Sequence, residues 1–510
     1  MVSKSSVAES MNFTVKDILE ATGGRLERGS EDAAITGVSI DSRTICPGEV
    51  FFAISGENFD GHSFVAAAVR NGAKCVVVEV VMGDIPGHGE GAEAKPRKGA
   101  DNVIVVRDAL RAMGELAARV RAGFNRPLIA VTGSSGKTTT KEMIASILSR
   151  CGSVLKTDGN KNNLVGVPLT LFGLDDKKGS AVVELGISEP GEMRRLAWMT
   201  SPDVALITNI GRSHMEGLGS LDNVAKEKLE LYDAVARRDK GGVMVVNLDD
   251  ERIAAYAEGV PEERIVTFGS KVVQGRGVDV FVREVALDGD NLKVDYVIRG
   301  EEVEVVFTSP CLTNAINGAA AIAATLPLGV ETKDAAGGLS SFTQPAGRME
   351  VLEAGEVKIL DDSYNANPDS EAEAILSLAA MAAATERRSV AILGDMLELG
   401  SASERLHREL GALVAGLKID TLITVGKASE ALSIGAKNAG ISDDRVMHFA
   451  SNDRLIKALK GVVMEGDVVL VKGSRSSHME EVVEGILKTF LPQTGSRQSK
   501  DGNAAGKGDT

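Results

Sequence analysis

Three patterns of apolar and polar residues follow one another along the chain. Between about residues 13 and 106, short apolar runs such as "CVVVEVV" and "NVIVV" alternate with helical segments. From residue 127, apolar runs such as "LIAVTG", "AVVELG" and "VALITNIG" end in glycine turns followed by helices. Such unbroken apolar strands are typical of a parallel sheet covered on both faces. Residues 278–307 alternate apolar and polar positions between turn signals, which predicts antiparallel strands.

A second strand–helix series begins after about residue 329, with strands such as "VKILDD", "SVAILGD" and "TLITVG". It predicts another doubly wound domain. We therefore predict an α/β protein with three domains. These are a small α/β N-terminal domain (12–106), a central P-loop-type domain whose mostly parallel sheet has an antiparallel β excursion (107–328), and a C-terminal Rossmann-like doubly wound domain (329–492). We expect a helix over 107–122 to link the first two domains, a surface loop over 87–100, and a disordered tail over 493–510.

Composition restricts the partners of the protein. The 510 residues include 57 Lys plus Arg and 72 Asp plus Glu, for a net charge of −15, which argues against a nucleic acid or an anionic membrane surface. The four cysteines are widely separated and form no C-x-x-C pair, which indicates a reduced protein without a disulfide framework. The N-terminus lacks the apolar core of a signal peptide, and no apolar run reaches the ~18 residues of a membrane span. We expect a soluble, cytoplasmic protein without membrane insertion.

The stretch "LIAVTGSSGKTTTKEM" predicts a phosphate-binding loop between a strand and a helix. The common pattern G-x-x-x-x-G-K-[ST] has its first glycine where this chain has Val131. Gly133 and Gly136 still allow the main chain to wrap a phosphate, and the helix start favours an anion. Lys137 would neutralise phosphate charge and Thr138 would bind Mg²⁺; a plain glycine turn is the alternative. The predicted ATP-binding loop comprises Gly133, Ser134, Ser135, Gly136, Lys137, Thr138 and Thr139.

Two later residues are candidate metal ligands. Glu184 ends "AVVELG", and His214 follows "VALITNIGRSH". Each alone would more often be a capping or surface residue, but both follow strands whose carboxyl ends collect ligands in such sheets. The next helix, "NVAKEKLELYDAV", carries Lys228. By its charge pattern alone, this helix would present a solvated face with i,i+4 ion pairs.

Together these motifs resemble the Mur ligases of peptidoglycan synthesis, which use a T-G-x-x-G-K-[ST] loop without the first Walker glycine. "GNKNNLVGVP", "ELGIS", "NIGRSHMEG" and "AKEKLEL" resemble the central domain of that family. "DSRTICPGEVFFAISGENFDGH" resembles its uridine-nucleotide-binding domain. "DDSYNANPDS", "GDMLELG" and "VKGSRSS" resemble the C-terminal domain of the member that adds D-alanyl-D-alanine. The resemblance covers about residues 13–491.

The resemblance implies ATP-dependent joining of D-alanyl-D-alanine to UDP-N-acetylmuramoyl-tripeptide through an acyl phosphate. It implies these small molecules as partners, and ATP and two Mg²⁺ ions as cofactors. We also expect a monomer. The metal ligands would be Thr138, Glu184, His214 and Lys228. Lys228 would carry a carbamate derived from CO₂, contrary to the solvated-face interpretation. Lys137, Lys228 and His214 form the expected catalytic set.

The remaining site residues are also implied by the resemblance. The expected nucleotide contacts outside the loop are Asn314, Asn317, Arg348, Asp362 and Asn365. The expected substrate contacts are Ser42, Arg43, Asp60 and His62 on the uridine side, and Asn160 and Asn163 near the reacting phosphate. The chain departs from the family pattern P-G-x-H-N before the adenine-side helix, where it reads "PCLTN".

Two other functions are compatible with parts of the sequence. A different ligase of the superfamily, such as a folate polyglutamate ligase or an earlier Mur enzyme, would share the central motifs. The uridine motif argues against the first, and "DDSYNANP" against the second. A non-catalytic ATP-binding scaffold or switch would bind nucleotide without forming an amide. For His407 and His478 we expect packing or surface roles.

Overall fold

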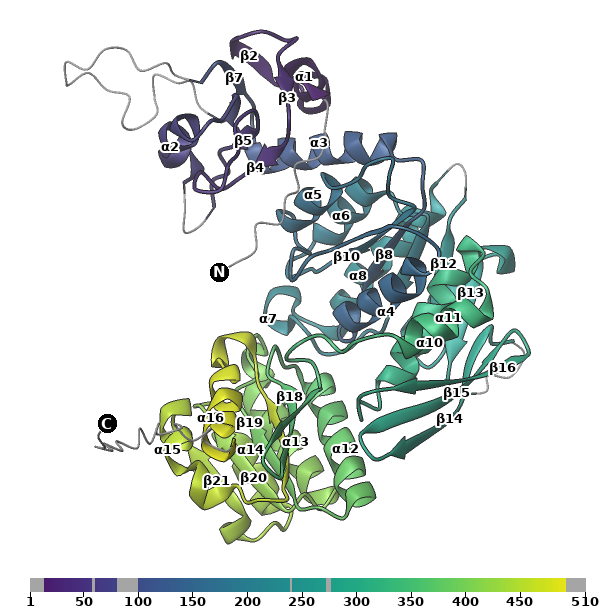
Figure 1. Ribbon diagram of the computed structural model, residues 1–510, viewed down its shortest axis with the longest axis vertical. Coiled ribbons are helices and arrows are strands. Elements are labelled where there is room, and N and C mark those ends of the chain that lie inside the picture. The colour runs from purple at the N-terminus through teal and green to yellow at the C-terminus, as the bar shows by residue number, and fades with distance from the viewer. Residues whose placement is uncertain (1–12, 57–59, 80–99, 239–240, 272–276, 492–510) are drawn as a thin grey trace, which may run out of the picture. The chain divides into compact units, whose positions relative to one another are not determined.

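The computed structural model describes residues 13–56, 60–79, 100–238, 241–271 and 277–491 (Figure 1). These residues form two compact units. The first contains residues up to 345 together with the short segments 367–373 and 397–403, and the second contains the rest. The predicted tail over 493–510 lies outside the described residues, as does the predicted loop over 87–100 apart from Ala100.

The first unit begins with a five-stranded sheet in the order β2-β7-β6-β5-β4. Strands β4 to β7 are parallel to their neighbours, and β2 is antiparallel to β7. The strands are β2 (Arg25–Arg28), β4 (Val38–Ser39), β5 (Val50–Phe52), β6 (Cys75–Val78) and β7 (Asn102–Val105), with a separate antiparallel pair of β1 (Phe13–Thr14) and β3 (Ala34–Ile35). The helical segments are α1 (Val15–Thr22), η1 (Gly61–Phe64) and α2 (Val65–Arg70).

A nine-stranded sheet follows, in the order β16-β15-β14-β13-β12-β11-β8-β10-β9. The parallel strands are β8 (Leu128–Thr132), β9 (Val154–Lys156), β10 (Ser180–Glu184), β11 (Val204–Ile207), β12 (Val243–Asn247) and β13 (Ile265–Gly269). The antiparallel excursion consists of β14 (Val280–Asp288), β15 (Asn291–Ile298) and β16 (Glu301–Phe307); β15 is antiparallel to both of its neighbours, while β14 also pairs in parallel with β13. Because β8 lies between β10 and β11, the strand order reverses at β8.

Helices cover both faces of this sheet, and β8 contributes to both cores. Leu128 and Ala130 belong to the core that includes α3, α5, α6 and α8. Ile129 and Val131 belong to a second core, which includes residues of α4, α10 and α11; Figure 1 labels these three helices. The residue at the missing Walker glycine is therefore a fully buried core side chain. The helices are α3 (Ala109–Gly123), α4 (Lys137–Ser149), α5 (Gly166–Leu171), α6 (Glu192–Thr200), α7 (Met215–Leu218), α8 (Leu221–Ala236), α9 (Glu251–Ala257), α10 (Asn314–Thr325) and α11 (Thr332–Ser340).

The second unit contains a six-stranded sheet in the order β17-β18-β22-β19-β20-β21. All its neighbouring strands are parallel except β17, which is antiparallel to β18. The strands are β17 (Glu350–Ala354), β18 (Val357–Asp362), β19 (Ser389–Leu393), β20 (Thr421–Val425), β21 (Val446–Phe449) and β22 (Val468–Lys472). The associated helices are α12 (Pro368–Thr385), α13 (Ser403–Gly416), α14 (Glu430–Asn438), α15 (Asn452–Val462) and α16 (Glu480–Phe490); residues 368–373 of α12 and the first residue of α13 belong to the first unit.

The predicted fold class is confirmed: three α/β regions are present, with the antiparallel excursion in the central one. The predicted linking helix corresponds to α3. The exact domain limits stay predictions, and α11, which follows the predicted limit at residue 328, packs against α4 in the first unit. Within the described part of the chain, no helix has both the length and the apolar character needed to cross a membrane.

The four cysteines provide a test of these cores. All four lie in the described residues and none forms a disulfide; Cys46 and Cys151 are exposed, whereas Cys75 and Cys311 are buried. Burial raises the pKa of the Cys75 thiol to about 12, which suppresses the reactive thiolate.

We expect a thiol reagent to modify two cysteines rapidly in the native protein and four in denaturant. A double Cys46→Ser, Cys151→Ser variant should lose the rapid phase, and rapid reaction of a third thiol in the native protein would contradict this core assignment.

Candidate active site

Three neighbouring strands of the nine-stranded sheet place the predicted phosphate and metal residues at one edge. Strand β8 pairs in parallel with β10 on one side and with β11 on the other. Their carboxyl ends therefore meet at the same edge. The phosphate loop follows β8, Glu184 ends β10, and the segment leading to His214 follows β11.

The phosphate loop requires glycine at two positions. Gly133 has φ +152°, and an added Cβ would lie 1.9 Å from Thr208 Oγ1. Gly136 has φ +76°, and a Cβ there would lie 2.5 Å from Asn317 Oδ1. Helix α4 begins immediately afterwards at Lys137, so the positive end of its dipole faces the loop. The loop therefore has the backbone geometry and positive dipole end that bind a phosphate.

Hydrogen bonds from the segment after β11 hold this loop. Thr208 Oγ1 donates to the Ser135 carbonyl at 2.6 Å. Asn209 Oδ1 accepts the Ser135 N–H at 2.9 Å, and its Nδ2 donates to Ser135 Oγ at 2.9 Å. Ser134 Oγ donates to the Gly211 carbonyl at 2.9 Å and accepts the Gly211 N–H at 2.8 Å. The phosphate loop and the segment leading to His214 are thus fixed to each other.

Two lysine amines meet at one carbonyl oxygen of the loop. Lys137 Nζ donates to the Gly133 oxygen at 2.8 Å, and Lys228 Nζ donates to the same oxygen at 3.0 Å. Lys228 is 1% exposed, although it lies on a helix rich in charged residues. Burial, assisted by the nearby Lys137 charge, holds the pKa of the Lys228 amine well below its usual range. The buried position of Lys228 contradicts the solvated-face interpretation at this residue.

Glu184 has one carboxylate oxygen without a hydrogen bond among the described residues. Its Oε1 accepts Asn162 Nδ2 at 2.9 Å, whereas Oε2 is buried and has no such partner. A buried carboxylate oxygen without a donor is costly unless a ligand satisfies it. A divalent cation would do so.

His214 has a left-handed backbone conformation, with φ +52°, at the start of α7. Its Nδ1 lies 2.8 Å from Oε2 of Glu398, a residue of the 397–403 segment in the same compact unit. A carboxylate that engages one ring nitrogen leaves the other as the metal-binding atom. No group of three His, Cys, Asp or Glu side chains arranged to hold a metal occurs in the described ranges. Carboxylate and hydroxyl donors nevertheless suit Mg²⁺, which takes further ligands from phosphates and water.

The predicted asparagines occupy different environments. Asn163 Oδ1 accepts the N–H groups of Val165 and Gly166 where α5 begins, while Asn160 is exposed. Asn317 lies beside Gly136 of the phosphate loop. Asn314 is fully buried, and its Nδ2 donates to Gln344 Oε1 at 3.1 Å. The structure therefore brings Asn317 to the loop, and the ligand contacts of all four asparagines stay predictions.

The predicted uridine-side residues follow neighbouring parallel strands. Ser42 and Arg43 follow β4, and Asp60 and His62 follow β5. His62 Nδ1 lies 2.7 Å from Asp60 Oδ1, while its Nε2 accepts the Glu79 N–H at 2.9 Å. Because both ring nitrogens are engaged, His62 is placed to orient Asp60. Contact of these residues with uridine stays a prediction.

The second unit groups its predicted nucleotide residues at the end of β18. Asp362 is paired in register with Lys472 at the end of β22, and the two side chains form an ion pair. Lys472 Nζ also donates to the Asn365 carbonyl at 2.9 Å. The Arg348 guanidinium lies 4.2 Å from the centroid of the Tyr364 ring. Lys472 therefore joins the Asp362 carboxylate to the Asn365 backbone, and Arg348 lies over the neighbouring Tyr364 ring.

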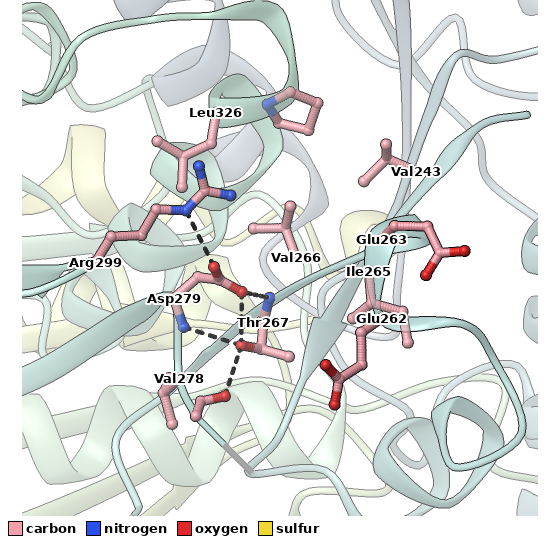
Figure 2. A pocket seen from close by; sticks show the side chains of 12 residues that line it. Val243, Glu262, Glu263, Ile265, Val266, Thr267, Val278, Asp279, Arg299 and Leu326 are labelled. Carbon is pink, nitrogen blue, oxygen red and sulfur yellow. Dashed lines mark hydrogen bonds and ion pairs between the residues drawn. The ribbon is translucent and has the colours of Figure 1, made fainter.

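Figure 2 shows a pocket of about 540 Å³ in the first unit. It lies at the amino ends of β12 and β13, where Asp279 accepts hydrogen bonds from Thr267 and from Arg299 Nε. None of the predicted site residues lines this pocket. The residues predicted to bind phosphate and metal instead lie at the carboxyl ends of the strands.

Several residues of the site were not predicted from the sequence. Asn162 contacts Glu184, Asn209 holds the phosphate loop, and Lys472 pairs with Asp362. Asn162 lies within the quoted "GNKNN", but residue type could not distinguish it from Asn160 and Asn163. Lys472 could have been predicted as a site residue, because "VKGS" ends an apolar strand. In a parallel sheet the ends of neighbouring strands lie side by side, as Asp362 and Lys472 do.

Comparison with known proteins gives a consistent assignment. A model of the Mur ligase middle domain matches residues 131–325, a Mur ligase glutamate ligase domain matches 347–475, and a Mur ligase family catalytic domain matches 34–121. A Bacillus subtilis UDP-N-acetylmuramoyl-tripeptide–D-alanyl-D-alanine ligase is 34% identical over 94% of this chain and 99% of its own length. The chain belongs to the Mur ligase family. The Escherichia coli protein of the same name is 33% identical over 93% of this chain and 98% of its own length.

Solved Mur ligases have the same fold. MurF from Acinetobacter baumannii matches with a TM-score of 0.82 and 31% identity, covering 94% of this chain and 99% of that one. A MurF ligase from Thermotoga maritima, solved in complex with ADP, matches with a TM-score of 0.74 and 27% identity, covering 89% and 97%. These matches extend the family assignment across all three sheet regions.

Substitution of Gly133 tests the phosphate loop. In Gly133→Ala, the new methyl group would displace Thr208, which holds Ser135. Since overpacking costs about 1–3 kcal/mol, we expect the affinity for ADP, measured by calorimetry, to fall about tenfold. Gly152→Ala is the matched control, because a Cβ there meets nothing within 4 Å. Equal ADP affinity of Gly133→Ala and the wild type would contradict the loop assignment.

Proposed function

We propose that this Mur ligase joins D-alanyl-D-alanine to UDP-N-acetylmuramoyl-tripeptide at the expense of ATP, in the last cytoplasmic step of peptidoglycan precursor synthesis. The observation that carries the proposal is the full-length similarity to ligases named for this reaction, at 34% and 33% identity. The phosphate loop at the carboxyl edge of the central sheet supports it, because the reaction requires a bound nucleoside triphosphate.

The chemistry explains why ATP is needed. A peptide carboxylate is a poor electrophile because its leaving group would be oxide. Attack of a carboxylate oxygen on the γ-phosphorus releases ADP and gives an acyl phosphate. The D-alanyl-D-alanine amine then attacks the acyl carbon, and the tetrahedral intermediate expels phosphate to form the amide. The protein contributes by positioning three substrates and by neutralising negative charge as it develops.

The residues around Gly133 fit this role. Lys137 would neutralise the β- and γ-phosphates, together with the N–H groups at the start of α4. Thr138, Glu184 and His214 would hold Mg²⁺, and the buried Glu184 Oε2 without a hydrogen-bond donor supports this assignment. Bound Mg²⁺, two ions in our proposal, supplies positive charge at the phosphoryl oxygens.

We include a carbamate on Lys228 in the proposal. The Lys228 ammonium must first lose a proton; the neutral amine then adds CO₂ and releases a second proton, which leaves an anionic carbamate that would help to hold Mg²⁺. The buried position of Lys228 beside Lys137 supports it, because both burial and a neighbouring cation disfavour the ammonium form. Without the modification, the site would have Glu184 as its one predicted carboxylate ligand.

The other predicted contacts complete the proposal. Ser42, Arg43, Asp60 and His62 would bind the uridine nucleotide, and Asn160 and Asn163 would lie near the reacting phosphate. Asn314 and Asn317 would contact ATP on its adenine side. Arg348, Asp362 and Asn365 would contact the nucleotide from the second unit. The protein would act as a cytoplasmic monomer with domains at 12–106, 107–328 and 329–492.

A substrate panel tests the activity. We expect phosphate release from ATP only when UDP-N-acetylmuramoyl-tripeptide and D-alanyl-D-alanine are both present, with the amide product detected by mass spectrometry. Lys137→Ala should lower the ligation rate roughly a hundredfold or more, because it removes a cation from the transferring phosphate. Ligation of a single amino acid would favour another superfamily ligase. Nucleotide binding without amide formation would favour a scaffold.

The carbamate has its own test. Lys228→Ala should lose roughly a hundredfold or more in kcat, and added short carboxylic acids should restore part of it by supplying the missing anion. Lys226→Ala, on the same helix, is the control and should keep wild-type activity. Full activity of Lys228→Ala without added acid would refute the carbamate.

A further inference from the structure

A second buried lysine lies one turn along the helix that carries the phosphate lysine. Lys141 follows Lys137 by four residues in α4 and is 1% exposed. Its Nζ donates to the Thr157 carbonyl at 2.7 Å and lies 2.9 Å from Glu142 Oε1. Lys141 thus joins the phosphate-loop helix to the segment after β9.

Thr157 continues this connection to the candidate metal ligand. It is fully buried, and its Oγ1 accepts the backbone N–H of Glu184 at 2.9 Å. The Thr157 N–H donates to the Val182 carbonyl at 3.1 Å. The segment from Thr157 also carries Asn162, whose side chain binds Glu184 Oε1. Glu184 is therefore held at its backbone by Thr157 and at its carboxylate by Asn162.

Burying the Lys141 side chain at this position costs free energy of folding. A buried ammonium loses hydration, and a well-packed apolar side chain of similar size is often neutral or stabilising in its place. Besides its ion pair with Glu142, the ammonium adds a directed hydrogen bond to the Thr157 carbonyl oxygen. That hydrogen bond fixes the distance between helix α4, which begins at the phosphate loop, and the end of β10, where Glu184 lies.

We propose that Lys141 and Thr157 are positioning residues that set Glu184 relative to the phosphate loop, so that one metal ion can contact both the carboxylate and the bound phosphates. This inference rests on the proposed function for its catalytic consequence. Its structural content is a chain of two hydrogen bonds, from Lys141 Nζ to the Thr157 carbonyl and from the Glu184 N–H to Thr157 Oγ1. Neither residue is proposed to touch substrate.

Metal binding tests the proposal directly. Mn²⁺ affinity is measured by electron paramagnetic resonance on the full chain with a non-hydrolysable ATP analogue. Thr157→Val removes the acceptor for the Glu184 N–H and keeps the shape of the side chain; we expect Mn²⁺ affinity to fall about tenfold. Thr157→Ser keeps the acceptor and should stay within about twofold of the wild type. Equal effects of Val and Ser, or no effect of either, would overturn the proposal.

A second pair of variants tests Lys141. Lys141→Met should weaken Mn²⁺ binding in the same direction as Thr157→Val. Lys156→Met is the matched control, because the half-exposed Lys156 pairs with the same Glu142 and should leave Mn²⁺ affinity unchanged. In ligation, Thr157→Val and Lys141→Met should lower kcat and raise the Mg²⁺ concentration for half-maximal rate, with KM for D-alanyl-D-alanine unchanged.

Thermal unfolding of every variant separates positioning from stability. If Thr157→Val and Lys141→Met both fail to fold, these residues serve stability alone and the proposal is wrong. A wild-type protein that binds Mn²⁺ and the ATP analogue but forms no amide would refute the proposed function. The Mn²⁺ comparison would still decide the positioning roles, because it does not depend on turnover.

Discussion

The convergence of Lys137 and Lys228 on the Gly133 carbonyl is the interaction on which the candidate site depends. It joins the start of α4 to the middle of α8 through one backbone oxygen of the phosphate loop. Two ammonium groups at one oxygen repel each other, and deprotonation, modification or a bound anion would relieve that repulsion. A phosphate in the loop or a carbamate on Lys228 would each relieve it. The conformation of the phosphate loop and the charge of Lys228 on α8 therefore depend on each other.

Much of the fold could be predicted from the sequence because the central strands are unbroken apolar runs that end in glycine turns. Burial on both faces leaves such strands few alternatives, and the alternation over 278–307 distinguishes the antiparallel strands equally clearly. Val131 shows the limit of motif matching. Judged against the Walker pattern it is a defect, whereas in the structure it fills the core on one face of β8.

The parts that could not be predicted depend on long-range contacts between polar residues. The charge pattern of α8 indicates a solvated face, yet Lys228 is buried and the Glu227 carboxylate accepts the N–H groups of Gly191 and Met193. Only the family resemblance singled out Lys228. Similarly, Asn162 is one of three nearby asparagines, and its position next to Glu184 results from the pairing of β10 with β9. Residue spacing does not encode such contacts, because they join segments that meet only in the folded sheet.

The alternation of β8 between two cores also affects how the protein unfolds. Leu128 and Ala130 anchor one helical layer, Ile129 and Val131 anchor the other, and the phosphate loop leaves from the end of the same strand. Unfolding of either layer would therefore remove packing contacts from β8. A nucleotide bound at the loop would therefore stabilise both layers against unfolding. The central region would then unfold as one cooperative unit, with a free energy of unfolding raised by the binding of the nucleotide.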